Sequence, residues 1–239
     1  MGAILKRELS SYFNSAIAYV VMGVFFFFSG LFFYVYCITG NSSSLAYVFS
    51  SMFFIIIFAI PVITMKTFSE EKRQRTDQAL LTAPASLTEI AMGKFLGAFI
   101  LYAICCSIIL VYGVVISFFV TPQWSVILCT MLGILLLGGA LIAINVFISS
   151  LTESVVIAAV ISMGVNLLIY FMNQIISLIG VTWIKEILEK IDFVNYYSNF
   201  TYGLLNVTDV VFFLSIIGLF IFFIVRVLEK KRWSWGEVS

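Results

Sequence analysis

Long apolar runs separated by short polar connections dominate the chain. Six of these runs are long enough to cross a bilayer, since about 20 residues of helix span a hydrocarbon core of about 30 Å. We place the spans at residues 17–38, 45–65, 92–120, 124–149, 154–180 and 207–228. The third and fifth exceed the required length, which predicts tilt or extension past the membrane. The pattern predicts an all-α integral membrane protein, with residues 1–239 forming a single transmembrane domain of six helices.

The third and fourth runs are separated by a single turn signal. No charged residue occurs between Phe95 and Thr152, and only Thr121-Pro122-Gln123-Trp124 interrupts this apolar stretch. Proline ends a helix and tryptophan favours the membrane interface. The tetrapeptide therefore predicts a loop between two spans.

The N-terminal segment Ala3–Phe13 has a helical pattern of its own. Leu5, Leu9 and Tyr12 or Phe13 recur at helical spacing, with charged residues between them. This pattern is typical of a short helix lying in the membrane interface, and the alternative is an irregular tail.

A second amphipathic segment, Trp183–Ile191, lies between the fifth and sixth runs. Its apolar side chains form one stripe, and Lys and Glu fill the other face. The aromatic stretch that follows, Asp192–Asn206, also carries Asn, Ser and Thr. We interpret both stretches as re-entrant or interfacial helices on the outer side of the membrane.

Composition and charge agree with a membrane protein and predict its orientation. Charged residues make up 10% of the chain, against about 25% in a typical soluble domain, and the mean hydropathy is +1.14. Of the 13 Lys and Arg residues, 11 fall at the two termini, in the second connection and, for Lys94, at the start of the span that follows it, and 2 fall in the other connections. The positive-inside rule then places both termini in the cytoplasm, in a multi-pass protein of the inner or plasma membrane.

The second connection, Lys66–Pro84, holds 7 of the 25 charged residues. Ser69 is a plausible N-cap with two carboxylates following it, and Glu71 and Arg75 are spaced as an i,i+4 pair. These signals predict a short cytoplasmic helix over about residues 70–82, between the second and third spans. Its apolar end favours docking to another protein. A solvated loop with a few apolar residues against lipid is the equally weighted alternative.

Several kinds of chemistry are missing from the sequence. The single Gly-Lys pair, Gly93-Lys94, is preceded by Thr88 where the ATP-binding P-loop needs Gly, and followed by Phe95 where it needs Ser or Thr. The chain has no histidine, and its four cysteines form no C-x-x-C pair and lie in or beside apolar runs. We therefore expect no catalytic site, no cofactor and no metal in this chain.

Polar residues within the spans are few. Asn145, Asn166 and Asn173 fit either hydrogen bonding between helices or the lining of a substrate pathway. Lys94 lies near the cytoplasmic end of its span, where its ammonium can extend to the interface. Gly93-x-x-x-Gly97 is a small-residue motif for close helix packing, and a dimer contact is one use of it. The scarcity of intramembrane charge argues against a proton- or sodium-coupled carrier.

Two stretches resemble the ABC-2-type permeases, the membrane subunits of a class of ABC transporters. The segment EEKRQRTDQALLTAP, residues 70–84, has that family's acidic-basic run followed by Thr, an acidic residue, Leu-Leu and Pro. Arg75 stands where the family often has Gly, and Gln78 where it often has Glu. The stretch NFTYGLLNVTDVVFFLS, residues 199–215, is similar to the gliding-motility-associated permease subfamily.

The resemblance implies an architecture and two sets of functional residues. It implies a cytoplasmic coupling helix that contacts a separate ABC ATPase, which binds ATP and Mg, and a second permease chain in a homodimer or similar heterodimer. The expected ATPase-coupling residues are Glu70, Glu71, Lys72, Arg73, Thr76, Leu80 and Leu81. The expected extracellular gate comprises Trp183, Ile187, Ile191, Tyr197, Phe200 and Gly203.

The function implied is that of a permease subunit in an ATP-driven ABC exporter. It would couple ATP hydrolysis in the partner chain to substrate export or force transmission, within membrane lipid and without nucleic acid. Two alternatives remain from the sequence, namely a non-transporting scaffold or signal-relay subunit and a secondary carrier without an ATPase.

Overall fold

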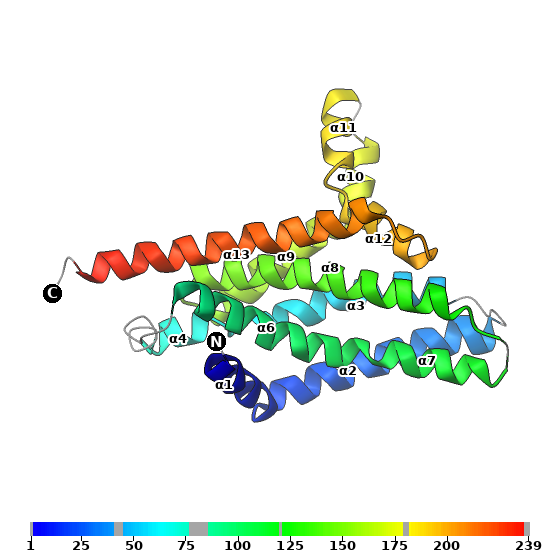
Figure 1. Ribbon diagram of the computed structural model, residues 1–239, viewed down its shortest axis with the longest axis horizontal. Coiled ribbons are helices and arrows are strands. Elements are labelled where there is room, and N and C mark those ends of the chain that lie inside the picture. Colours follow the sequence, from blue (N-terminus) through cyan, green and yellow to red (C-terminus); the bar gives the residue numbers. More distant parts are fainter. Residues whose placement is uncertain (1, 41–44, 77–85, 120, 179–181, 237–239) are drawn as a thin grey trace.

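The structure is a computed structural model that describes residues 2–40, 45–76, 86–119, 121–178 and 182–236. Every regular element in these ranges is helical, and most of the helices run along one axis as an elongated bundle (Figure 1). The helices are α1 (Gly2–Phe13), α2 (Ala16–Phe33), η1 (Tyr34–Thr39), α3 (Ala46–Thr64), α4 (Ser69–Arg73), α6 (Leu87–Cys106), α7 (Ile108–Ser117), α8 (Trp124–Leu151), α9 (Val155–Tyr170), α10 (Met172–Leu178), α11 (Thr182–Glu189), α12 (Phe193–Thr201) and α13 (Val207–Gly236).

Five helical stretches within the described ranges are long and apolar enough to cross a membrane. They cover Ala16–Thr39, Ala46–Arg73, Leu87–Ser117, Trp124–Leu151 and Val207–Arg232. Each corresponds to one predicted apolar run, so the all-α fold and these spans are confirmed at the level of length and hydropathy. The last helix extends past the predicted limit of residue 228.

The predicted fifth span, 154–180, is not one continuous helix. Its α9 has 16 residues, about 24 Å at a rise of 1.5 Å per residue, which is shorter than a bilayer core of about 30 Å. The helix ends at Tyr170 with Phe171 as its C-cap, and α10 then begins with Met172-Asn173-Gln174. In Figure 1, α10 and α11 stand away from the bundle axis. The chain leaves the bundle at the polar pair Asn173-Gln174. The length of the apolar run alone does not predict this break.

The predicted third span, 92–120, also differs in its limits. It begins earlier, at Leu87, because Ser86 and Glu89 form a reciprocal capping box. It is interrupted at Ser107, where the chain passes from α6 into α7, which ends at Ser117. The sequence Ser86-Leu-Thr-Glu89 has the spacing of a capping box, which marks the start of a helix.

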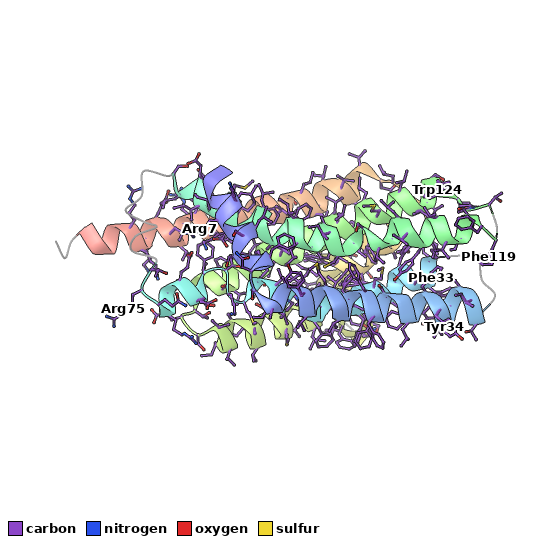
Figure 2. All side chains as sticks on the ribbon, turned by 90° about the horizontal axis from the view of Figure 1, so that it is seen from below. Arg7, Phe33, Tyr34, Arg75, Phe119 and Trp124 are labelled. Carbon is purple, nitrogen blue, oxygen red and sulfur yellow. The ribbon has the colours of Figure 1, made fainter. Side chains whose placement is uncertain are left out.

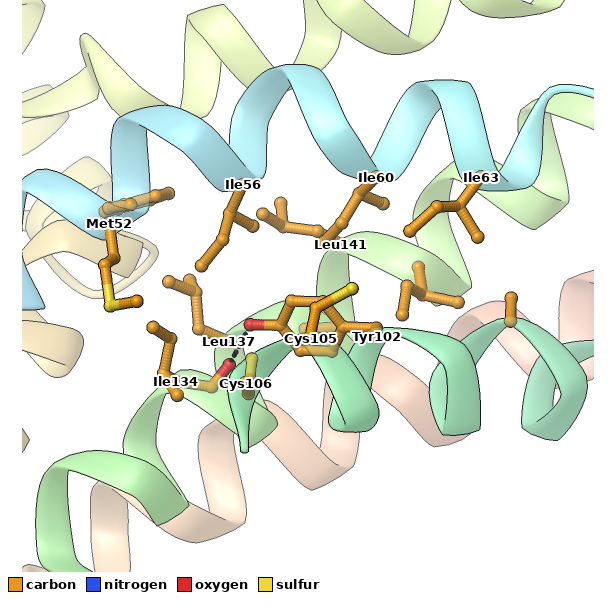
Figure 3. Packing of buried hydrophobic residues seen from close by; sticks show 14 of the residues in the cluster. Met52, Ile56, Ile60, Ile63, Tyr102, Cys105, Cys106, Ile134, Leu137 and Leu141 are labelled. Carbon is orange, nitrogen blue, oxygen red and sulfur yellow. Dashed lines mark hydrogen bonds between the residues drawn. The ribbon is translucent and has the colours of Figure 1, made fainter. Parts of the chain in front are cut away.

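The core forms where α3, α6 and α8 meet, with α8 in the centre. Tyr102 of α6 is fully buried and donates a 2.7 Å hydrogen bond from its hydroxyl to the Ile134 carbonyl of α8 (Figure 3). Gly138 makes this approach possible, because a Cβ at that position would lie 2.2 Å from two atoms of the Tyr102 ring. A missing side chain on α8 therefore determines how closely α6 packs.

Candidate functional site

The two ends of the bundle differ in character. Arg7 and Arg75 lie at one end, and Phe119 and Trp124 lie at the other (Figure 2). Helices α1 and α4 and the C-terminal end of α13 share the first of these, which we call the charged end (Figure 1). Both described termini of the chain are thus at the same end, as the topology prediction requires.

Helix α4 at the charged end is shorter than predicted. It covers Ser69–Arg73 and ends there because Arg75 has a left-handed φ of 56°, so the helix predicted over 70–82 is not continuous through residues 74–76. Residues 77–82 of that prediction lie outside the described residues. The amides of Arg75 and Thr76 bond back to the carbonyls of Lys72 and Glu71, at 3.1 and 2.9 Å. This is a Schellman C-cap, whose left-handed position usually holds Gly. It explains why Gly suits position 75.

The Schellman turn supplies a direct test. Replacing Arg75 with Gly is expected to stabilise the turn by about 1 kcal/mol, because a non-Gly residue pays about that amount to hold a left-handed conformation. Hydrogen exchange of the amides at residues 74–76 is expected to slow. Replacement with Ala keeps the Cβ and is expected to leave exchange unchanged. Equal effects from Gly and Ala would rule out the conformational explanation.

Two local predictions about α4 are also corrected. Ser69 is not an N-cap, because it lies inside the helix and its hydroxyl donates to the Met65 carbonyl. Glu71 does not pair with Arg75. Its carboxylate points toward α1 and α6 and pairs there with charges that are distant in sequence.

Glu71 belongs to a four-residue group, the Lys94 cluster, formed by Arg7, Glu8, Glu71 and Lys94. The Lys94 ammonium lies 3.1 Å from the Glu8 carboxylate and 3.0 Å from that of Glu71. It also donates a 2.6 Å hydrogen bond to the Thr67 carbonyl. The Arg7 guanidinium lies 2.7 Å from Glu71 and 3.2 Å from Glu8. The cluster holds two charges of each sign and joins α1, α4 and α6.

Lys94 does not extend to the interface as predicted, since its side chain is only 1% exposed. A buried ammonium is tolerated when carboxylates and hydrogen-bond acceptors surround it. The Phe68 ring adds a cation–π contact, with its centroid 4.9 Å from the ammonium. Lys94 is therefore an internal connector between helices.

The glycine motif allows α1 to reach this cluster. A Cβ at Gly93 would lie 2.8 Å from the Ile4 side chain, and one at Gly97 would lie 2.9 Å from the Glu8 Cβ. The Gly93-x-x-x-Gly97 motif thus receives α1 of the same chain. The structure has a helix, α1, over the predicted segment Ala3–Phe13, and its packed face follows Ile4, Glu8 and Tyr12. Tyr12 of the predicted stripe belongs to that face, together with Ile4 and Glu8, which the prediction did not include. The place of α1 in the membrane interface stays a prediction.

Tyr12 anchors the C-terminal end of α1 to α3. Its hydroxyl donates a 3.1 Å hydrogen bond to the Ile63 carbonyl of α3 and lies 3.3 Å from the Thr67 hydroxyl. Burial raises the pKa of Tyr12 well above its usual value, so the group stays a neutral donor.

A second set of bonds joins α4 to α8. The break between α3 and α4 leaves backbone groups that need partners, and the Ser149 hydroxyl of α8 supplies them. It accepts from the amides of Phe68 and Ser69 at 3.1 and 3.2 Å, and donates to the Met65 carbonyl at 3.2 Å. The buried Lys72 ammonium donates to the Ser150 carbonyl near the end of α8. Cations at a helix C-terminus are also favoured by its dipole.

Comparison with known protein families identifies the family of this chain. The family described as "ABC-2 family transporter protein" matches residues 13–228, most of the chain. The chain belongs to the ABC-2 transporter family. It is a multi-pass membrane protein, and members of this family are membrane subunits that normally partner an ABC ATPase. No match was found among curated proteins.

In this ABC-2 chain, the predicted coupling residues divide into two groups. Arg73 and Thr76 are exposed and Glu70 is partly exposed, while Lys72 is buried and Glu71 points into the Lys94 cluster. Leu80 and Leu81 lie outside the described residues. The outward group remains available for a partner, and the inward group attaches α4 to the bundle.

The predicted gate residues of this ABC-2 chain also divide. Tyr197 is buried in α12 and donates a 2.8 Å hydrogen bond to the Phe49 carbonyl of α3. Phe200 packs where Gly133 of α8 lacks a side chain, and Gly203 follows with a φ of 77°. These three residues pack α12 against the bundle. Trp183 and Ile191 are exposed, and the side chain of Ile187 is outside what the structure describes.

The three asparagines do not form one group. Asn166 is buried and donates a 3.2 Å hydrogen bond to the Ile57 carbonyl of α3. This is the hydrogen bonding between helices that was one of its two predicted roles. Asn145 is buried, and neither of its amide atoms has a protein hydrogen-bond partner among the described residues. Asn173 is exposed on α10. A pathway role for these residues remains a prediction.

Sequence reasoning did not identify Arg7, Glu8, Ser149 and Ser150 as members of the site. Two signals were present for the Lys94 cluster: a lysine between the glycines of a packing motif, and a glutamate on an amphipathic helix. Ser149 and Ser150 carry no such signal, because their role depends on which helix α8 meets.

Proposed function

We propose that this chain is the permease subunit of an ATP-driven exporter, and that α4 receives movement from a separate ABC ATPase. The observation that carries the proposal is the two-sided character of α4. Arg73 and Thr76 face outward, while Glu71 and Lys72 bond inward to α6 and α8. A short helix held by these bonds cannot move independently of the bundle. A force applied to α4 would therefore be transmitted to the helices that it contacts.

The inward bonds suggest how the movement is transmitted. Ser149 and Lys72 connect α4 to the last turns of α8, and the Lys94 cluster connects it to α1 and α6. Displacement of α4 therefore acts on three helices together. ATP and Mg are bound by the partner ATPase in this proposal, and the present chain supplies no catalytic group.

Helix α8 can carry the displacement to the opposite end. Its 28 residues measure about 42 Å. Near its start, the Thr130 hydroxyl donates a 3.0 Å hydrogen bond to the Phe200 carbonyl of α12. One helix thus contacts α4 at its end and α12 at its beginning. We propose that movement of α12 opens the gate, which comprises Trp183, Ile187, Ile191, Tyr197, Phe200 and Gly203.

A charge reversal tests the docking surface. Arg73→Glu is expected to reduce both ATPase co-purification and permease-dependent ATPase activity, because an exposed cation at the contact becomes an anion. A loss of about tenfold in affinity corresponds to about 1.4 kcal/mol. The measurement is ATPase capture and ATP hydrolysis with the purified full-length permease in nanodiscs.

The matched control is Lys185→Glu, which reverses an exposed charge on α11. It is expected to leave ATPase capture unchanged. If both variants bind the ATPase like the wild type, α4 is not the docking surface. If both lose it equally, the effect is one of total charge.

A further inference from the structure

A proline stands in α3, near the charged end of the bundle. Pro61 lies inside the helix and is buried. Because proline has no amide hydrogen, it cannot donate to the carbonyl four residues earlier, which belongs to Ile57. The helix nevertheless continues to Thr64, and Figure 3 shows it running past Ile60 and Ile63. The carbonyl of Ile57 therefore needs a donor from outside α3.

Asn166 of α9 supplies that donor. Its side-chain amide donates a 3.2 Å hydrogen bond to the Ile57 carbonyl, and both residues are fully buried. The other polar atom of the side chain, Oδ1, has no protein hydrogen-bond partner among the described residues. The asparagine on α9 is thus bonded to the one carbonyl that Pro61 leaves free on α3.

The stretch after Pro61, residues 62–73, is bonded to the charged end. It comprises the last residues of α3, the break between the two helices and α4. Its backbone carbonyls accept hydrogen bonds from Tyr12 of α1, Lys94 of α6 and Ser149 of α8. We call residues 62–73 the inner arm, because these bonds attach them to three helices at one end of the bundle.

The part of α3 before Pro61 has different partners. Tyr197 of α12 donates a 2.8 Å hydrogen bond to the Phe49 carbonyl, and its ring centroid lies 5.6 Å from that of Phe53. With the bond from Asn166, these contacts attach this part of α3 to α9 and α12. Pro61 therefore stands where one set of hydrogen-bonding partners ends and the other begins.

We propose that Pro61 is a hinge about which the inner arm pivots, and that Asn166 is a latch that keeps the freed carbonyl bonded. A proline weakens its helical turn, because one backbone hydrogen bond is missing and the ring crowds the preceding turn. The carbonyl of Ile57 lies before the hinge, so a pivot of the inner arm leaves its bond to Asn166 intact. The use of this pivot in transport rests on the proposed function, but the hinge and the latch can be detected without an ATPase.

A double-mutant cycle tests the latch. Pro61→Ala restores an amide that can donate to the Ile57 carbonyl, so the bond from Asn166 is no longer needed. Asn166→Leu is expected to raise the unfolding equilibrium constant in mixed micelles about tenfold more in the wild-type background than in the Pro61→Ala background, equivalent to about 1.4 kcal/mol. Asn145→Leu is the matched control, because Asn145 is equally buried and its amide has no protein partner among the described residues. Its effect is expected to be the same in both backgrounds.

Hydrogen exchange of the full chain in nanodiscs tests the hinge. Pro61→Ala is expected to slow exchange of the amides of residues 62–65 about tenfold, because it strengthens the turn that holds them. Pro61→Gly restores the same amide, but glycine keeps the turn flexible, so exchange is expected to stay close to that of the wild type. The two variants thus replace the latch equally and differ only in the flexibility of the hinge.

Two results would overturn the proposal. Equal effects of Asn166→Leu in the wild-type and Pro61→Ala backgrounds would show that Asn166 does not compensate for the proline. Exchange at residues 62–65 that Pro61→Ala leaves unchanged, or that both variants slow equally, would show that this turn is not a hinge. Failure of the wild-type chain to bind an ABC ATPase would contradict the proposed function instead, and would leave both measurements unaffected.

Discussion

Replacement of Lys94 by Met is expected to lower the free energy of unfolding by about 3 kcal/mol. The change leaves the carboxylates of Glu8 and Glu71 close together at a largely buried site, with only Arg7 to balance them. Removing one partner of a buried ion pair typically costs about 3–5 kcal/mol, because the remaining charge is uncompensated. Unfolding in mixed micelles measures the loss.

Lys66→Met is the matched control for this change. Lys66 lies between α3 and α4, and its side chain is 39% exposed, with its ammonium 3.5 Å from Glu70. Exposed pairs contribute about 0.2–1 kcal/mol, so this variant is expected to unfold close to the wild type. Adding Glu8→Gln to Lys94→Met is expected to recover part of the loss. Equal stability of the Lys94 and Lys66 variants would show that the cluster does not hold α1, α4 and α6 together.

Gly138→Ala is the second change with a large expected effect, about 3 kcal/mol of destabilisation. Its Cβ would fall 2.2 Å from the Tyr102 ring, which cannot move freely because its hydroxyl is bonded to Ile134 (Figure 3). Overpacking of this kind forces shifts that cost about 1–3 kcal/mol, occasionally more. The same unfolding measurement applies.

Gly164→Ala supplies the comparison, since no atom lies within 4 Å of a Cβ at that position in α9. Helix propensity alone then favours Ala by about 1 kcal/mol. In a Tyr102→Leu background the cost of Gly138→Ala is expected to fall, because the clash is with the ring. A cost unchanged by that background would place the strain elsewhere.

The sequence predicted the spanning helices because membrane insertion is largely a property of local segments. A run of about 20 apolar residues buries its side chains in lipid and satisfies its backbone only as a helix. The same reasoning separated α7 from α8 at Pro122. It failed for the fifth run, where apolar length continued through Phe171 although the helix did not. Whether the helix of the fifth run continues depends on whether neighbouring helices extend beside that run.

The sequence predicted where charge gathers along the chain, but not the contacts that these charged side chains make. The concentration of charge drew attention to the connection between the second and third spans. The family's Gly preference at position 75 was noted, but the turn that the structure contains there was not predicted, because the helix was expected to continue to residue 82. Its inward bonds were missed, because Glu71 finds its cation 23 residues away in Lys94 and its second in Arg7, 64 residues away. An i,i+4 rule sees only the neighbour on the same helix, and α4 is too short to present one.

By itself, the sequence determined that this chain lies in a membrane as apolar helices and gathers its charge at the two termini and one internal connection. Those properties follow from transfer energies and helix geometry, which act over neighbouring residues. The tertiary structure alone decided that Gly93 and Gly97 receive α1, that Lys94 is buried between two carboxylates, and that Ser149 joins α4 to α8. These contacts connect residues far apart in the chain, and their energies depend on which helices pack together.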